Sequence, residues 1–229
     1  MMRQRWRAAT FVHWRYEREQ IESRVPDGIE VETFDGSAWV GIVAFLVQDL
    51  RLGPLPPVPG MSTMPETNVR TYVRGADGRS GVWFFPLDIA HPLVALAGRV
   101  AARLPYVGSA MEVRTRGDEL HYRGARRGRH AAAARYDISV RDDEPIEHVS
   151  ALEHFLTGRW SLLTFYGSRQ SSVAVEHQPW PLHRGSVVRL REGLLAADGL
   201  PPPAGEPLVH VSPGVDARIG PPRLLTRPS

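Results

Sequence analysis

Residues 65–73 read PETNVRTYV, in which larger polar side chains alternate with threonine and valine. Successive side chains of a β-strand point to opposite faces, so an extended conformation puts Glu66, Asn68, Arg70 and Tyr72 on one face. The threonines and valines then form the other face. A strand is therefore predicted here, and the surroundings of its polar face bear directly on function.

Two interpretations of the polar face remain open. In the first, the Thr/Val face packs inward and the polar face is solvated, as is common in antiparallel sheets. In the second, the polar face lines an enclosed cavity and converges on a small ligand. Arg70 would then hold a carboxylate or carbonyl group, and Glu66 would be available for proton transfer. The proline-rich segment 52–61 is accordingly a surface connector or a lid over the cavity.

Short apolar segments separated by glycine and proline surround this strand and indicate further hairpins. Asp35-Gly36 fits a type I′ turn between residues 29–34 and 37–45, and the second arm is apolar enough for a central strand. Three more antiparallel pairs are predicted: 68–73 with 81–85, 111–116 with 119–123 and then 135–141, and 160–166 with 172–177.

Helices are predicted to be few and peripheral. They cover residues 17–25, 92–104, a short segment opened by Ser150-Ala151-Leu152-Glu153, and residues 187–197. No repeat or linker divides the chain, so we expect one domain over residues 1–229. The predicted fold class is α+β, mainly β, with a large antiparallel β-barrel or sandwich and a few peripheral helices.

The composition excludes several chemistries. All 28 basic residues are arginine, and the 229-residue chain has neither lysine nor cysteine. An internal imine and a pyridoxal-phosphate attachment are therefore impossible, as are disulfides, thiolate nucleophiles and cysteine-held metals. His148 and His154, like His177 and His183, lack the i, i+4 spacing of helical metal ligands. We predict no metal and no cofactor.

The formal net charge of +3 is only weak support for an anionic partner. Five basic residues cluster in one connector, namely Arg123, Arg126, Arg127, Arg129 and His130. Glycines interrupt this cluster and few aromatic residues lie near it, so a solvated loop is favoured over a nucleic-acid contact. The longest apolar run, residues 38–47, is too short to span a bilayer. We expect a cytoplasmic protein that contacts neither nucleic acid nor membrane.

Nine blocks of the chain carry a family resemblance when taken together. They are Gln4-Arg5-Trp6, His13-Trp14, residues 25–30, 34–41, 65–73 and 81–85, Leu104-Pro105-Tyr106, and residues 179–182 and 210–216. In this order they resemble the YqjF-like family of uncharacterised bacterial proteins, whose fold is similar to that of acetoacetate decarboxylase. The resemblance covers essentially the whole chain and implies a barrel-like antiparallel fold with a central cavity.

The resemblance also bears on mechanism. In acetoacetate decarboxylase, the substrate ketone condenses with a lysine that follows a Tyr-Pro pair, after a helix that carries Gly-Arg. The similar stretch here is Gly98-Arg99 and then Leu104-Pro105-Tyr106-Val107. This alignment puts Tyr106 in the place of the lysine and Val107 in the place of its cationic neighbour. Since tyrosine cannot form an imine, decarboxylase activity is not carried over.

Two functions from different classes remain open. In the first, the cavity binds a small hydrophobic, carboxylate- or carbonyl-bearing molecule without Schiff-base chemistry. Its candidate ligand-binding residues are Glu66, Asn68, Arg70, Tyr72, Trp83 and Tyr106. In the second, a lysine-independent lyase or hydratase acts on a small oxo acid, with Glu66 as general acid or base and Arg70 as carboxylate anchor; Tyr72 or Tyr106 would hydrogen-bond the oxyanion. We favour binding because the chain contains no recognised catalytic set, and whether its copies assemble into an oligomer stays open.

Overall fold

The computed structural model describes residues 1–57, 63–128 and 133–226. The strands in this part of the chain are β1 Met2–Tyr16, β2 Glu30–Val31, β3 Ala38–Leu52, β4 Thr63–Arg74, β5 Ser80–Ile89, β6 Tyr106–Arg116, β7 Glu119–Arg126, β8 Arg135–Pro145, β9 Ser161–Tyr166, β10 Arg169–Glu176, β11 His183–Glu192 and β12 Leu208–Leu224. The helices are α1 Arg18–Glu22, α2 Pro92–Ala101, α3 Ala151–Thr157 and α4 Leu194–Ala197. None of the helices described is long and apolar enough to cross a membrane.

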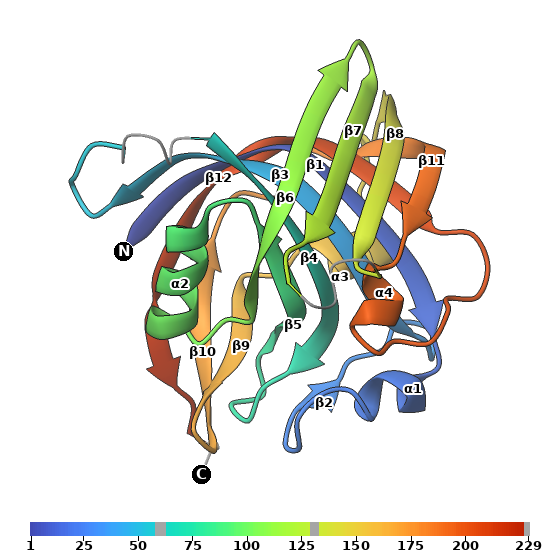
Figure 1. The fold of residues 1–229 in the computed structure, drawn as a ribbon. Helices are drawn as coiled ribbons and strands as arrows, with labels where there is room; N and C mark the ends of the chain where they lie inside the picture. Colours follow the sequence, from blue (N-terminus) through green and yellow to red (C-terminus); the bar gives the residue numbers. More distant parts are fainter. Residues whose placement is uncertain (58–62, 129–132, 227–229) are drawn as a thin grey trace.

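The described strands form one twelve-stranded sheet that closes on itself (Figure 1). Its order is β10-β9-β5-β6-β7-β8-β11-β12-β1-β3-β4-β2, and further pairings join β10 to β12 and β5 to β4. The predicted, mainly β fold class is thereby confirmed. Most pairs are antiparallel, but β5 pairs in parallel with both β6 and β9, which the sequence did not indicate.

Strands β12, β1, β3 and β4 form a layer that is buried on both faces. Val12, Ile42 and Val69 share one face and pack with Ile138 and Val140 of β8 in a single apolar cluster. The opposite face is covered by a second cluster, which includes Ala95 of α2 and Trp180 of the segment after β10. The layer therefore divides the interior into two halves.

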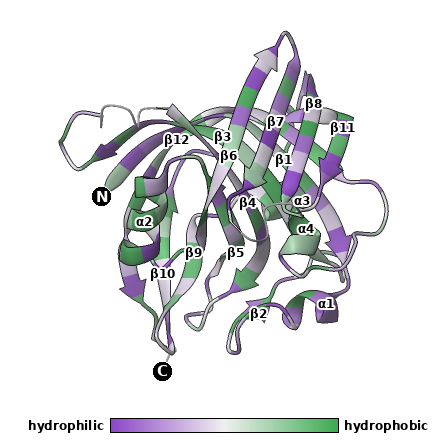
Figure 2. Ribbon diagram, in the orientation of Figure 1, coloured by the Kyte–Doolittle hydropathy of each residue, from purple (hydrophilic) through white to green (hydrophobic). Residues whose placement is uncertain are grey.

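The half on the β7 and β8 side contains buried apolar and aromatic side chains. Tyr122 and Tyr136 are buried there, and their hydroxyl groups bond to Thr10 and Thr67 at 2.9 and 2.8 Å. Hydropathy alternates along β7 and β8, as expected for strands with one face toward a core (Figure 2). We call this side, which is lined by Val12, Ile42, Val69, Ile138 and Val140, the aliphatic half.

Several predicted elements are confirmed. The hairpins β4–β5, β6–β7–β8 and β9–β10 all form. Helix α2 begins at Pro92, and Ser150 and Glu153 form the capping box that opens α3. The first ten residues of β3 are almost entirely buried, as predicted for a central strand.

Two local predictions are wrong. Residues 187–192 belong to strand β11, which pairs with β8, and only the four residues of α4 are helical. Because Val187, Leu190 and Leu194 are few and far apart, their helical spacing could not outweigh the ladder hydrogen bonds that β8 offers. The predicted hairpin of residues 29–34 with 37–45 does not form. Asp35 and Gly36 do adopt positive φ angles, but β2 pairs with β4 instead of β3. Only an isolated bridge joins Phe34 to Ser37.

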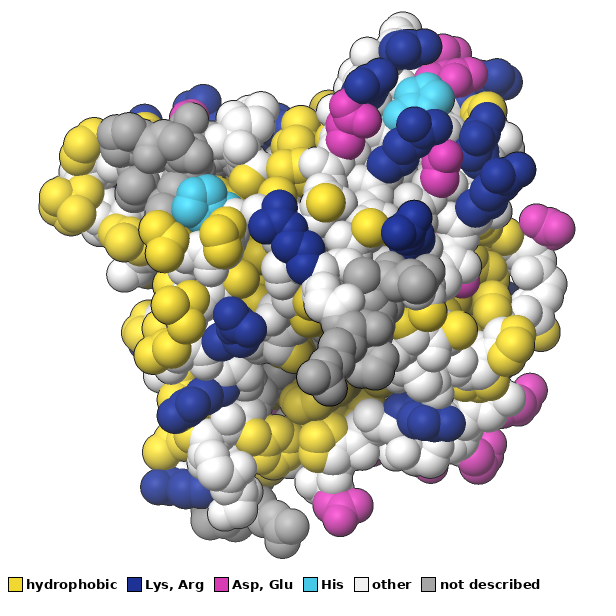
Figure 3. Space-filling view, in the orientation of Figure 1, with side chains coloured by type: hydrophobic (Ala, Val, Ile, Leu, Met, Phe, Trp, Pro, Cys, Tyr) yellow, Lys and Arg dark blue, Asp and Glu magenta, His cyan; other side chains and the backbone are white. Residues whose placement is uncertain are grey.

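The predicted basic loop is also corrected in part. Arg126 is buried and bonds to the carboxylates of Asp88 and Asp198, so it is neither solvated nor available to a phosphate. Arg129 and His130 lie outside the described residues, as do residues 58–62 of the proline-rich segment. At the exposed ends of β6 to β8, arginines and carboxylates are intermixed (Figure 3), and Arg123 pairs with Asp137 at 3.2 Å.

Candidate functional site

The polar face of β4 is enclosed. Glu66, Asn68 and Tyr72 are 7%, 2% and 0% exposed, and Arg70 is half-buried. Thr67, Val69 and Thr71 face the aliphatic half and are also buried. The solvated-strand interpretation is therefore excluded, because both faces of the central part of β4 are largely buried.

Strand register places other polar residues beside this face. His13 of β1 is opposite Gly41 of β3, and Gly41 is opposite Arg70. A Cβ atom at Gly41 would lie 2.5 Å from the His13 ring, so only glycine lets the imidazole cross β3. His13 thereby reaches Tyr72, whose hydroxyl group is 2.6 Å from Nε2.

The hydrogen bonds assign the protons of this pair. The Tyr72 hydroxyl donates to the Leu156 carbonyl of α3 at 2.8 Å, so His13 Nε2–H donates to the tyrosine oxygen. Burial is the main cause that lowers the pKa of His13, and the nearby charge of Arg70 adds to it. His13 is therefore a neutral imidazole with a lone pair on Nδ1.

Glu66 is a carboxyl group in an apolar setting. Burial raises its pKa to about 7, and the hydrogen bond from the Tyr106 hydroxyl, at 3.3 Å from Oε2, opposes the rise. Arg70 forms no ion pair with Glu66 among the described residues; instead its Nη2 donates to the Leu156 carbonyl at 3.0 Å. Glu66 can therefore exist both protonated and ionised near neutral pH.

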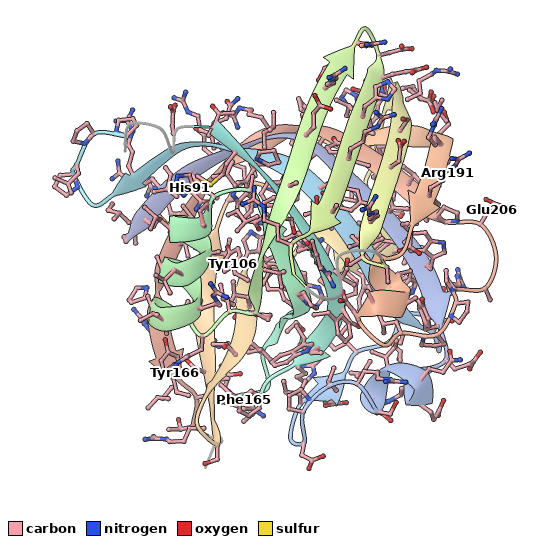
Figure 4. The ribbon with its side chains drawn as sticks, viewed as in Figure 1. His91, Tyr106, Phe165, Tyr166, Arg191 and Glu206 are labelled. Carbon is pink, nitrogen blue, oxygen red and sulfur yellow. The ribbon has the colours of Figure 1, made fainter. Side chains whose placement is uncertain are left out.

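Tyr106 is positioned by α2. Its ring lies against Gly98, where a Cβ atom would be 2.4 Å from the ring, and Figure 4 shows Tyr106 beside this helix. Burial and the neighbouring Glu66 carboxylate raise the pKa of Tyr106. The phenol stays protonated and acts as a hydrogen-bond donor to Glu66.

A second histidine borders the same face. His210 of β12 is opposite Phe11 of β1, and Phe11 lies in register with Val43 and Asn68. His210 Nε2 is 3.3 Å from the Glu153 carboxylate of α3. Burial lowers the pKa of His210 while the Glu153 carboxylate opposes that shift.

Five buried polar atoms from these strands make no hydrogen bond to any described residue. They are His13 Nδ1, Trp39 Nε1, Asn68 Oδ1, Arg70 Nε and His210 Nδ1. Buried polar groups are nearly always paired, because an unpaired one costs about 1–3 kcal/mol. We call the group formed by His13, Glu66, Asn68, Arg70, Tyr72, Tyr106 and His210 the inner site. It offers one guanidinium donor, several acceptors and a carboxyl group that can change its protonation state.

The structure does not bring every candidate to this site. Trp83 is opposite Thr71 and shares its face, so it packs against Phe165 at a ring distance of 6.0 Å, away from the inner site. His13 and His210 were not predicted, although both lie in blocks of the family resemblance. Neither of the strands that carry them, β1 and β12, was predicted, so nothing in the local sequence pointed to these two histidines.

The residues described contain no group of His, Asp and Glu with the geometry of a metal site. His177 instead packs among Trp6, Trp160 and Trp180, with ring centroids 5.4–6.0 Å away. Burial lowers its pKa. The inner site is thus built from hydrogen-bonding and acid-base groups alone, as far as the described part of the chain shows.

Comparison with known proteins gives one family and one fold. The model of DUF2071, described as "Uncharacterized conserved protein (COG2071)", matches residues 3–216. The uncharacterised protein YqjF of Bacillus subtilis (strain 168) is 30% identical over 221 residues, which cover 96% of this chain and 91% of YqjF.

Solved structures agree with the fold. Acetoacetate decarboxylase from Legionella pneumophila subsp. pneumophila str. Philadelphia 1 superimposes with a TM-score of 0.68 at 10% identity, covering 99% of this chain and 88% of that one. The enduracididine biosynthesis enzyme MppR in complex with pyruvate gives 0.67 at 16% identity, with 100% and 92% covered. At these identities the likeness shows the fold alone. The chain therefore belongs to the DUF2071 family of uncharacterised proteins, of which YqjF is a relative, and has the fold of acetoacetate decarboxylase.

Proposed function

We propose that the inner site binds a small molecule with a carboxylate or carbonyl group, without forming an imine. The observation that supports this most strongly is the set of unpartnered polar atoms on His13, Asn68, Arg70 and His210. They come from β12, β1 and β4, three of the four strands of one buried layer. A small ligand that hydrogen-bonds to some of them would satisfy groups that the folded chain leaves unpaired.

The chemistry of these atoms selects the ligand class. The Arg70 guanidinium retains an unused Nε–H, which suits a carboxylate or carbonyl oxygen. The lone pairs on Asn68 and the histidines suit a hydroxyl or enol proton. A fold relative, MppR, has been solved in complex with pyruvate, which is a molecule of this class.

Calorimetric titration with pyruvate tests the proposal. Arg70→Met keeps the length of the side chain but removes its donors, so we expect affinity to fall about tenfold or more, as for loss of a charged hydrogen bond. Arg116→Met changes an exposed arginine at the end of β6 and serves as the matched control. Equal binding by all three proteins, or no binding of any small oxo acid by the wild type, would contradict the proposal.

One observation favours a second function, that of a lysine-independent enzyme for small oxo acids. The Glu66 carboxyl has a pKa of about 7, which suits a general acid or base at neutral pH, and the Tyr106 phenol is a donor beside it. Exchange of the protons next to the carbonyl of pyruvate for deuterium, followed by NMR, measures such proton transfer. Glu66→Gln should abolish the exchange; a rate that this change leaves unaltered would remove Glu66 from the mechanism.

A further inference from the structure

A separate pocket opens on the outer side of α3. Its volume is about 680 Å³, within the range of small-molecule sites. It lies between the turn before β3, the turn before β5, α3 with the residues that follow it, and strands β10 and β12. Its wall includes three arginines and three large aromatic residues, namely Arg79, Arg159, Arg223, Phe34, Phe155 and Trp160. None of the inner-site residues lines it.

The charge of this pocket is mainly positive. Glu32 is the one carboxylate among its lining residues, and it accepts hydrogen bonds from Arg159, Arg74 and Ser80. Its charge is therefore already matched. Arg79 is 85% exposed and lies 3.9 Å from Asp77, and Arg223 forms no ion pair with a described residue. The Arg223 guanidinium thus remains for an anion, and the exposed Arg79 is held only by this long contact to Asp77.

The same pocket offers flat apolar surface. The Phe34 and Phe155 rings are 5.6 Å apart, and the Arg159 guanidinium stacks over Phe155 at 4.4 Å. Trp160 is 41% exposed, although it is among the largest apolar side chains of the protein. An exposed aromatic ring next to a cation is suited to an aromatic ligand that carries negative charge.

We propose that this pocket is a second ligand site, for small organic anions with a flat apolar group, such as aryl carboxylates. The carboxylate contacts Arg79 and Arg223, and the ring packs against Phe155 and Trp160. The site lies outside the inner site but close to it, because Phe155 is 5.1 Å and the Arg159 guanidinium is 5.1 Å from the Tyr72 ring. A single layer of side chains separates the two.

The Trp160 indole provides a direct readout. Its Nε1–H donates to the His177 carbonyl at 3.0 Å, so it gives a defined NMR signal that Trp160→Phe identifies. Benzoate should shift this signal in a saturable way, and uncharged benzyl alcohol should bind about threefold to tenfold more weakly because it lacks the ionic contact. Raising the salt concentration should weaken benzoate binding, since exposed charges are screened.

Variants of the two arginines test where the carboxylate of benzoate binds. Arg223→Gln and Arg79→Gln should each weaken benzoate binding about twofold to fivefold, as for exposed ion pairs. Arg116→Gln makes the same charge change on β6 and should leave binding unaltered. Asn68→Leu, in the inner site, should also leave the Trp160 shift intact, which separates this proposal from the proposed function. No shift with benzoate, equal binding of benzyl alcohol, an equal effect of Arg116→Gln, or loss of the shift in Asn68→Leu would each overturn the proposal.

Discussion

Glu66 is a carboxyl group that folding buries in an apolar setting, and this makes the stability of the protein depend on pH. Its pKa is about 7 in the folded protein, against about 4.3 for an unfolded chain. The folded state therefore binds more protons between these values, and the free energy of unfolding falls as pH rises through this window. The total loss is about 4 kcal/mol, and it is complete above about pH 8.

Glu66→Gln removes this titration. We expect the variant to gain about 4 kcal/mol relative to the wild type between about pH 4.5 and pH 8, as measured by urea unfolding. Glu112→Gln, which changes an exposed carboxylate on β6, controls for the loss of one charge. A stability difference between Glu66→Gln and wild type that does not change with pH would contradict the burial of an ionisable Glu66.

The hydrogen bond from Tyr106 to Glu66 gives a second prediction for single residues. This bond lowers the pKa of Glu66 against the effect of burial, so Tyr106→Phe should raise the pKa further. The carboxyl carbon of Glu66, followed by NMR across pH, measures the change. Tyr122→Phe removes a buried hydroxyl from the aliphatic half and should leave the Glu66 titration unaltered. An identical titration in wild type and Tyr106→Phe would show that the bond is absent in solution.

Which of these residues could be predicted depended on the strength of their local pattern. The four polar residues of β4 alternate strictly, so their shared face followed from the sequence. The sequence could not show whether that face was exposed to solvent or enclosed, because both faces of a strand can be buried when layers cover them. His13 and His210 meet β4 only through the register of β1, β3 and β12, which no local pattern specifies.

At the scale of elements, the close contact between β1 and β3 depends on Gly41. Gly41→Ala would put a Cβ atom 2.5 Å from the His13 ring and displace it from Tyr72. We expect a loss of about 1–3 kcal/mol in the free energy of unfolding, as for overpacking of a core. Gly108→Ala, on β6, meets nothing within 4 Å and should change stability by less than about 0.5 kcal/mol.

Imidazole nitrogen shifts of His13 complete this test. In Gly41→Ala the Nε2 shift should lose the signature of the bond to Tyr72, whereas Gly108→Ala should retain it. Full stability and an unchanged His13 spectrum in Gly41→Ala would mean that the ring does not cross β3 at this point.

Elements that are determined by nearby residues were predicted, and elements that depend on distant residues were not. Hairpins such as β6–β7 and the capped helix α3 were predicted because turn and capping residues act within a few positions of the chain. The 15-residue β1 and 17-residue β12 were missed, since their partners are far away in sequence and their own residues do not alternate cleanly. The parallel pairings of β5 likewise depend on contacts with distant strands.

At the scale of the whole molecule, a buried ionic cluster joins distant parts of the chain. Arg126 of β7 bonds to Asp88 of β5 and to Asp198 at the end of α4. Arg126→Met would leave two buried carboxylates without a cation, and we expect a loss of about 3–5 kcal/mol in urea unfolding. Arg123→Met, at an exposed arginine on the same strand that pairs with Asp137, should cost less than about 1 kcal/mol.

Restoring charge balance provides the complementary test. Asp88→Asn combined with Asp198→Asn in the Arg126→Met background should recover part of the lost stability, because no buried charge then remains in the cluster. Equal losses for Arg126→Met and Arg123→Met would contradict the buried position of this cluster.

In the part of the chain that the structure describes, unpaired polar groups gather on one side of a shared layer, and apolar side chains cover the other side. A crystal structure of the protein with pyruvate tests this account most directly. We predict density for pyruvate within hydrogen-bonding distance of the Arg70 guanidinium and of at least one of Asn68 and His13. Pyruvate bound elsewhere, or an inner site that holds only water at saturating pyruvate, would contradict it.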